Sequence, residues 1–249
     1  MGFETIEYEL QDGVGVLRLN RPKCLNAINH VMRDELTAFW RDHTRDADLR
    51  VVLLCGAGRG FCAGFDITDQ ELMGPSTTGA PDTIYAAQRS FSEMILLMRR
   101  CPQPIVGAFQ GVAVGAGLSF AMACDVRLST PDARFQAAYI NLGLGGADMG
   151  SSYLLPRLIG TGNAARYLYT GDFMPADEAH RTGLVQQLAE AEELEEQAMA
   201  IARTIASKSP LGLRVTKEAL NAHAGSPGLE QALLYEDRNQ ALCIAQVAS

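Results

Sequence analysis

The stretch Ile105-Val-Gly-Ala-Phe-Gln-Gly-Val-Ala-Val-Gly-Ala-Gly-Leu-Ser119 joins an apolar run to a glycine-rich turn and then to an apolar helix. The run 105–109 predicts a strand buried on both faces, and residues 118–123 predict the helix. Glycines after a strand let the backbone turn and approach a ligand closely. Because the N–H groups near Ala116 open a helix, they should be unpaired and electropositive, which favours binding of an oxyanion.

A similar transition lies upstream, at Leu54-Cys-Gly-Ala-Gly-Arg-Gly-Phe-Cys-Ala-Gly-Phe-Asp66. It follows the apolar run 51–55, which predicts another buried strand. Close packing of strand on helix, with no ligand, would explain such glycines equally well. Phe120 stands at the third glycine position of a dinucleotide fingerprint, and no Gly-Lys-Ser/Thr follows either turn, so the sequence argues against dinucleotide and P-loop sites.

The order of the expected elements predicts an α/β protein with a helical end. Strands alternate with crossover helices over residues 1–189, and residues 190–249 are Ala/Glu/Leu-rich with helical periodicity. Pro210 and the segment 225–228 divide this second region into about three helices. A helix should begin at Asn29, and the stretch 73–81 should be a surface loop.

The composition excludes several classes of protein. With 21 Lys and Arg against 29 Asp and Glu, the net charge is −8, which argues against nucleic-acid binding. No apolar run approaches the roughly 18 residues of a membrane span. Six cysteines without a C-x-x-C pair indicate reduced thiols and a cytoplasmic protein. The four histidines form no ligand motif, so no metal site is expected.

Several motifs, in order and spacing, resemble the crotonase (enoyl-CoA hydratase/isomerase) superfamily over nearly the whole chain. They are Asn20-Arg-Pro-Lys-Cys-Leu-Asn-Ala27, Gly58-Arg-Gly-Phe-Cys-Ala-Gly-Phe-Asp-Ile67 and the stretch from Gly111 to Asp125, with shorter matches at 169–172, 176–183 and 209–210. The resemblance implies a crotonase-like spiral of ββα units with a helical C-terminal region that assembles homotrimers or dimers of trimers. It also implies an acyl-CoA thioester as ligand, with no further cofactor.

The resemblance carries specific residues with it. The backbone N–H groups of Phe65 and Ala116 would form an oxyanion hole around the thioester carbonyl, because enolate formation or water addition places negative charge on that oxygen. The implied coenzyme A contacts are Lys23, Leu25, Ala63, Asp66 and Ile67. Lys23 would face a phosphate, although a solvated surface lysine is the alternative.

The acid–base groups depart from the family pattern. Typical hydratases place two glutamates, one as base and one as acid, where this chain has Ser119 and Tyr139. One acid remains in the glycine-rich turn 143–150. Asp148 resembles the catalytic aspartate of related acyl-CoA isomerases and of a dehalogenase, and a single carboxylate suffices for a 1,3-proton shift. The alternative role for Asp148 is to cap the following helix.

Three functions follow from these residues. The first is an acyl-CoA hydratase or isomerase in which Asp148 carries the proton. The second is an acyl-CoA-binding protein with little activity, because both glutamate positions hold hydroxyls. The third is a hydrolase that uses Ser119, which requires a histidine base within reach. Asp66 and Asp125 are expected to be structural, and the identity of the acyl group stays open.

Overall fold

A six-stranded sheet forms the centre of the molecule, with strands in the order β1-β2-β3-β4-β6-β9. The computed structural model describes residues 2–225 and 228–247. β1 pairs antiparallel with β2, and the other neighbours are parallel. The strands are β1 (Ile6–Gln11), β2 (Val14–Leu19), β3 (Val51–Gly56), β4 (Ile105–Phe109), β6 (Val126–Ser129) and β9 (Gln187–Leu188).

A smaller sheet stands at the carboxyl ends of the central strands. It consists of β5 (Val112–Val114), β7 (Arg134–Gln136) and β8 (Met174–Pro175). β5 follows β4 after a two-residue turn, and Cys62 forms a parallel bridge with Ala113 of β5. The segment after β3 and the segment after β4 therefore run side by side beyond the edge of the main sheet.

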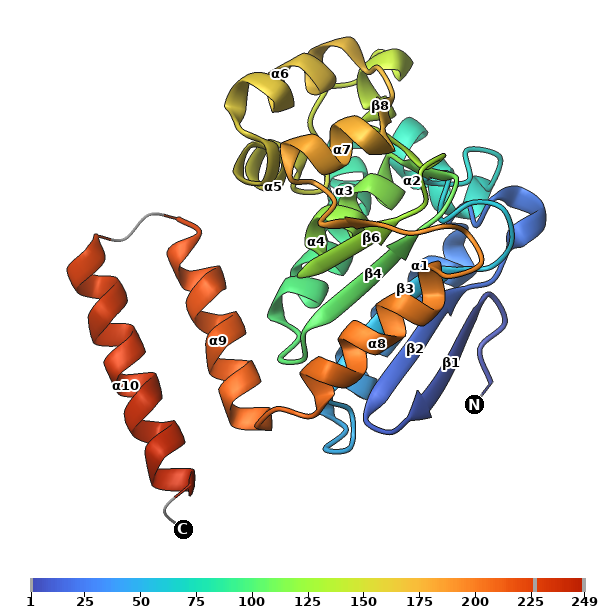
Figure 1. Ribbon diagram of the computed structural model, residues 1–249. Helices are drawn as coiled ribbons and strands as arrows, with labels where there is room; N and C mark the ends of the chain where they lie inside the picture. Colours follow the sequence, from blue (N-terminus) through green and yellow to red (C-terminus); the bar gives the residue numbers. More distant parts are fainter. Residues whose placement is uncertain (1, 226–227, 248–249) are drawn as a thin grey trace.

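Helices cover both faces of the main sheet, and the side chains of β3 show this division. Val52 and Leu54 pack in one hydrophobic cluster with α1 (His30–Asp42), α3 (Pro81–Arg100) and α4 (Ala116–Ala123). Val51 and Leu53 point the other way and pack with α8 (Leu194–Ala206), which crosses the opposite face (Figure 1). Because alternate residues of a strand face opposite sides, an uninterrupted apolar run is the expected sequence for such a strand.

The remaining helices lie outside this layered core. α5 (Ser151–Ile159), α6 (Thr161–Thr170) and α7 (Ala176–Thr182) gather at one end of the molecule, and α9 (Pro210–His223) and α10 (Leu229–Val247) form a hairpin that extends beyond α8 (Figure 1). Short 3-10 turns are η1 (Pro22–Cys24), η2 (His43–Arg45) and η3 (Ala138–Leu142). Among the described residues after β9 there are three helices. The division of the chain at residue 189 stays a prediction, and α8 packs on the main sheet.

Buried polar contacts attach α9 to the core. The Lys217 ammonium lies 2.9 Å from Asp125 Oδ2 and donates to the carbonyl of Gln103 at 2.8 Å. Asp125 also accepts from the backbone N–H of Ile105 at 2.8 Å and from Arg99 at 3.0 Å. As expected, Asp125 is therefore a structural carboxylate, held by a backbone amide and two cations.

One expected loop is wrong, because residues Gln70–Thr78 form the helix α2. The Asp69 carboxylate accepts from the N–H groups of Glu71 and Leu72, which satisfies two donors at the start of the helix. Gly, Pro, Ser and Thr are frequent in loops, and for this reason the sequence predicts a loop here instead of a capped helix.

Ser226 and Pro227, within the divider expected at 225–228, lie outside the described residues. Across the described parts of the chain, no helix combines the length and apolarity needed to span a bilayer.

Candidate active site

The two glycine-rich turns meet at Gly64 and Gly115. A Cβ added to Gly64 would lie 3.0 Å from the Val114 carbonyl oxygen and 3.8 Å from the Ala116 nitrogen. Gly64 has φ of +95°, a conformation that side-chain-bearing residues rarely adopt. The missing side chain therefore permits both the backbone conformation and the close approach of the two turns.

The N–H groups of Phe65 and Ala116 lie on these adjacent turns. Ile28 forms backbone hydrogen bonds with the residues on both sides of Phe65. Its N–H donates to the Gly64 carbonyl at 2.8 Å, and its carbonyl accepts from the Asp66 N–H at 2.9 Å. Neither Phe65 nor Ala116 shows a hydrogen-bond acceptor for its N–H among the described residues. The Phe65 ring packs on Phe91 of α3, with 4.3 Å between ring centroids. Both donors remain available for a ligand.

A buried asparagine holds the turn that precedes Phe65. The side-chain nitrogen of Asn26 is shared among the carbonyls of Ala57, Gly60 and Phe61 at 2.9 to 3.1 Å, and its oxygen accepts from the Arg21 N–H at 2.8 Å. Asn26 is fully buried and has φ of +54°. It therefore pins the 57–61 turn against the segment that carries Arg21.

Ser119 and Tyr139, the residues at the two expected glutamate positions, touch each other. Their hydroxyl oxygens are 3.1 Å apart, and both side chains are buried. Burial raises the pKa of Tyr139 above its ordinary value, and the nearby Asp148 carboxylate raises it further. A Cβ on Gly115 would lie 3.7 Å from the Tyr139 ring, so this pair adjoins the Ala116 turn. Tyr139 therefore carries its proton at neutral pH and acts as a hydrogen-bonding group.

Asp148 lies in the turn before α5 and is half-buried. Its Oδ1 accepts from the N–H of Met149 at 2.7 Å, and its own N–H donates to the Ser151 hydroxyl at 3.0 Å. The N-cap residue of α5 is Gly150, and the described residues provide no side-chain cap for this helix. Asp148 is therefore not the simple helix cap that the sequence allowed, and its charge acts on Tyr139.

The residues expected to contact coenzyme A follow two segments that run together. Lys23 is exposed in η1, and the half-buried Leu25 accepts from the Ala63 N–H at 2.9 Å. Ile67 is 65% exposed. The Asp66 carboxylate pairs with Arg21 at 3.1 Å, which fits its expected structural role. These positions therefore lie on two segments that are paired through Leu25 and Ala63, while their contacts with coenzyme A remain predictions.

A cavity also lies away from the two turns. It has a volume of about 780 Å³ and is lined mainly by α3, α5 and α9. Neither Phe65, Ala116 nor Asp148 lines it. The residues expected to carry the chemistry therefore lie outside this cavity.

Sequence reasoning missed four residues that hold the Phe65 side of the site: Arg21, Asn26, His30 and Asp69. Arg21 and Asn26 lie inside the quoted 20–27 motif, so they could have been singled out as loop-holding residues. Asp69 is followed by Gln-Glu-Leu72, a usual start for a helix. No signal in the sequence pairs His30 with Asp69, because they are 39 positions apart.

Two adjoining backbone turns with available N–H groups, in a fold of two sheets and C-terminal helices, match the arrangement expected of an acyl-CoA enzyme. The family model described as enoyl-CoA hydratase/isomerase matches residues 9–248. The chain therefore belongs to the enoyl-CoA hydratase/isomerase (crotonase) family, and the fold expected from the sequence is confirmed.

Individual relatives agree with this assignment. The chain is 35% identical to 1,2-epoxyphenylacetyl-CoA isomerase of Escherichia coli (strain K12), over 88% of this chain and 82% of that protein. It is 36% identical to a probable enoyl-CoA hydratase of Mycobacterium leprae (strain TN), over 91% and 78% of the two chains. The structure of an enoyl-CoA hydratase/isomerase from Cupriavidus metallidurans CH34 superimposes with a TM-score of 0.89 at 30% identity, covering 98% of this chain and 89% of that one.

Proposed function

We propose that the protein isomerises an acyl-CoA thioester through an enolate, with Asp148 as the proton carrier. The N–H groups of Phe65 and Ala116 would bind the carbonyl oxygen as it becomes anionic. The observation that carries this proposal is the grouping of Asp148, Tyr139 and Ser119 beside the Ala116 turn, with one carboxylate among the three. A relative is named as an isomerase of an acyl-CoA ester, which supports isomerisation of such an ester here.

A shift of one proton between two carbons of the acyl chain requires a single carboxylate. Asp148 removes a proton from one carbon of the acyl chain, and the electrons of the broken C–H bond delocalise onto the thioester oxygen as the double bond moves. The protonated Asp148 then returns the proton to the other end of the allylic system. Two donors fixed before the reaction can contribute roughly 3–4 kcal/mol each to stabilising the enolate.

Water addition fits this site less well. A hydratase must activate water on one side and deliver a proton on the other, which requires two groups that change protonation state. Burial keeps the Tyr139 proton in place, and the Ser119 hydroxyl lies against the Tyr139 oxygen. Ser119 is also without the histidine partner that a hydrolase needs, since its hydroxyl contact among the described residues is Tyr139.

The alternative is an acyl-CoA-binding protein with little activity, which the hydroxyls at both glutamate positions favour. A panel of acyl-CoA esters in deuterated water, followed by NMR, separates these functions. Deuterium at the α or γ carbon with no added water indicates isomerisation. Addition of water restores the hydratase assignment, and neither change, with binding intact, indicates a binding protein.

Asp148→Asn tests the proton carrier directly. We expect turnover to fall by roughly 10²- to 10⁴-fold, the usual contribution of a general acid–base group, while acyl-CoA binding persists. The exposed Asp132 offers a matched control, and Asp132→Asn should leave turnover unchanged. Unchanged turnover in Asp148→Asn would remove Asp148 from the mechanism.

We also propose that the protein assembles as a homotrimer or a dimer of trimers through its C-terminal helices. Four large apolar side chains of α9 and α10 are 64 to 75% exposed: Leu220, Leu229, Leu234 and Ile244. Exposed apolar side chains that gather on one surface are typical of protein–protein interfaces. Light scattering coupled to size exclusion measures the mass directly. A monomeric mass at micromolar concentration would contradict the proposal.

A further inference from the structure

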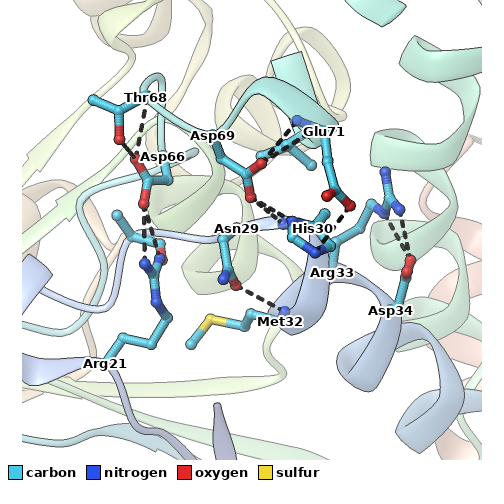
Figure 2. A network of polar contacts seen from close by, with 12 residues as sticks. Arg21, Asn29, His30, Met32, Arg33, Asp34, Asp66, Thr68, Asp69 and Glu71 are labelled. Carbon is cyan, nitrogen blue, oxygen red and sulfur yellow. Dashed lines mark hydrogen bonds and ion pairs between the residues drawn. The ribbon is translucent and has the colours of Figure 1, made fainter. Parts of the chain in front are cut away.

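Two charged contacts attach the segment after Phe65 to the segment 21–30 (Figure 2). The first joins Arg21 to Asp66, with both terminal guanidinium nitrogens 3.1 Å from Asp66 Oδ2. The other carboxylate oxygen of Asp66 accepts from the Thr68 hydroxyl at 2.6 Å. The pKa of Asp66 is lowered by the Thr68 hydroxyl and by Arg21, so the carboxylate is ionised when the enzyme works.

The second contact joins the start of α1 to the start of α2. The backbone N–H and Nδ1 of His30 both lie 2.8 Å from Asp69 Oδ2, and Nε2 lies 3.2 Å from Glu71 Oε2. The other oxygen of Asp69 caps α2 through the N–H groups of Glu71 and Leu72. Burial opposes ionisation of Asp69, but the hydrogen bonds from His30 and Leu72 bring its pKa down to about 2. The Asp69 carboxylate therefore holds the first turns of both α1 and α2.

Phe65 directly precedes the segment that these contacts hold. Ile28 holds the backbone on both sides of Phe65, through the Gly64 carbonyl and the Asp66 N–H. Arg21 and His30 flank Ile28 in sequence, and Asp66 and Asp69 follow Phe65. The backbone pair between Ile28 and residues 64 and 66 is therefore flanked in the 21–30 segment by Arg21 and His30, which hold the two carboxylates that follow Phe65.

We propose that Arg21 and His30 are positioning residues that act through Asp66 and Asp69 to aim the Phe65 N–H at the enolate oxygen. This inference rests on the proposed function of the Phe65 donor. Polar contacts are needed here because Phe65 and Asp66 are only half-buried, so packing alone does not fix the turn. A displacement of about 1 Å at a reacting centre can cost on the order of 100-fold in rate.

The His30 contact depends on pH with a definite sign. Its hydrogen bond to Asp69 raises the pKa of His30, and the carboxylates of Glu71 on α2 and Asp34 on α1 raise it further. Asp34 is in turn paired with Arg33. Protonated His30 donates to both Asp69 and Glu71, whereas neutral His30 keeps one N–H and turns a lone pair toward the other carboxylate. The contact is therefore complete at low pH and weakens as pH rises through the raised pKa of His30.

The decisive measurement is the infrared carbonyl stretch of bound butanoyl-CoA labelled with ¹³C at the carbonyl. This frequency falls when donors polarise the carbonyl, so it reports the oxyanion hole without requiring turnover. We expect Arg21→Gln to move the bound frequency back toward that of the free ester. In the isomerisation assay, kcat should fall by roughly 10- to 100-fold, between a slight misalignment and loss of a donor, while KM changes by less than about threefold.

His30→Gln keeps a donor for Asp69 but does not titrate. We expect a fall in kcat of roughly threefold to tenfold and loss of the part of the pH profile that declines as His30 deprotonates. Arg41→Gln, which breaks the ion pair with Glu93 in the last turn of α1 without touching residues 66–69 or the groups around His30, is the matched control and should behave as wild type. Arg21→Lys should restore part of the frequency shift.

The possible outcomes distinguish failure of the proposed oxyanion hole from failure of the positioning roles of Arg21 and His30. If the wild-type protein itself does not shift the carbonyl frequency, the proposed oxyanion hole fails. If the wild type shifts it and both Arg21→Gln and His30→Gln shift it equally, the positioning roles are overturned. A fall in thermal stability with kcat and the carbonyl frequency unchanged would also overturn them, since the residues would then support only folding.

Discussion

The two turns that carry the backbone donors are held by different forces. The Ala116 turn is packed: every residue of α4 is buried, and Gly117 lies directly against the Cys62 carbonyl. The Phe65 turn runs along the surface and relies on Arg21, His30 and their carboxylates. Packed apolar contacts do not titrate, whereas the ion pairs beside the Phe65 turn can weaken with pH and salt.

Gly117→Ala should break this arrangement most severely. An added Cβ would overlap the carbonyl oxygen of Cys62 and lie 2.9 Å from its Cβ. Because both are in the densely packed core, we expect a loss of about 1–3 kcal/mol or more in the free energy of unfolding. Turnover should fall on the order of 100-fold, because the two turns are forced apart. Chemical denaturation and steady-state kinetics measure both effects.

Gly162→Ala is the matched control for that change. Gly162 lies in α6, where an added Cβ meets no atom within 4 Å. Alanine there should stabilise the helix by up to about 1 kcal/mol and leave kcat unchanged. Equal tolerance of alanine at both positions would contradict the packed description of the Ala116 turn.

Asn26→Ala should have the next largest effect, and it sharpens the comparison. This residue is the buried exception on the Phe65 side, and its loss leaves three carbonyls without their shared donor. We expect the free energy of unfolding to fall by roughly 2–4 kcal/mol, with part of the cost arising from alanine at positive φ. Asn163→Ala on α6, which removes one contact to the carbonyl of Ile159 at the end of α5, should cost about 1 kcal/mol. A similar loss in both variants would show that Asn26 does not hold the turn.

The difference between the two turns also explains what the sequence could predict. Buried strands and α4 follow from local apolar runs, so β3, β4 and the position of Ala116 are readable from residues 51–55 and 105–119. Asn29 was correctly expected to start a helix, since its side chain caps α1. The contacts His30–Asp69 and Arg21–Asp66 join positions far apart in the chain, and a single sequence holds no periodicity that marks such pairs.

Tyr139→Phe should have a smaller effect. It removes the hydroxyl contact to Ser119 beside the Ala116 turn and leaves the ring in place. We expect a loss of about 1 kcal/mol in the free energy of unfolding and a fall in kcat of less than roughly tenfold. Because burial raises the pKa of Tyr139, the pH profile should be the same in both proteins up to about pH 10. A profile that changes below that pH would identify Tyr139 as an acid–base group.

Lys23→Ala should have the smallest effect, since it concerns an exposed residue of η1 beside the Phe65 turn. If Lys23 faces a coenzyme A phosphate, KM should rise by roughly twofold to fivefold, as expected for a surface charge pair, and kcat should not change. The increase should disappear with a pantetheine thioester, which has no such phosphates, and shrink at high salt. An equal increase in KM with both substrates would mean that Lys23 does not contact a phosphate of coenzyme A.

The buried Lys217 has a consequence for shortening the chain. Its ammonium completes the coordination of Asp125, whose carboxylate also anchors the first residue of β4. A protein cut between α8 and α9 would leave that carboxylate short of one cation at the strand that leads into the Ala116 turn, whereas a cut after α9 would leave the contact whole. Loss of α9 would therefore reach the central sheet through Asp125, whereas loss of α10 would leave this contact in place.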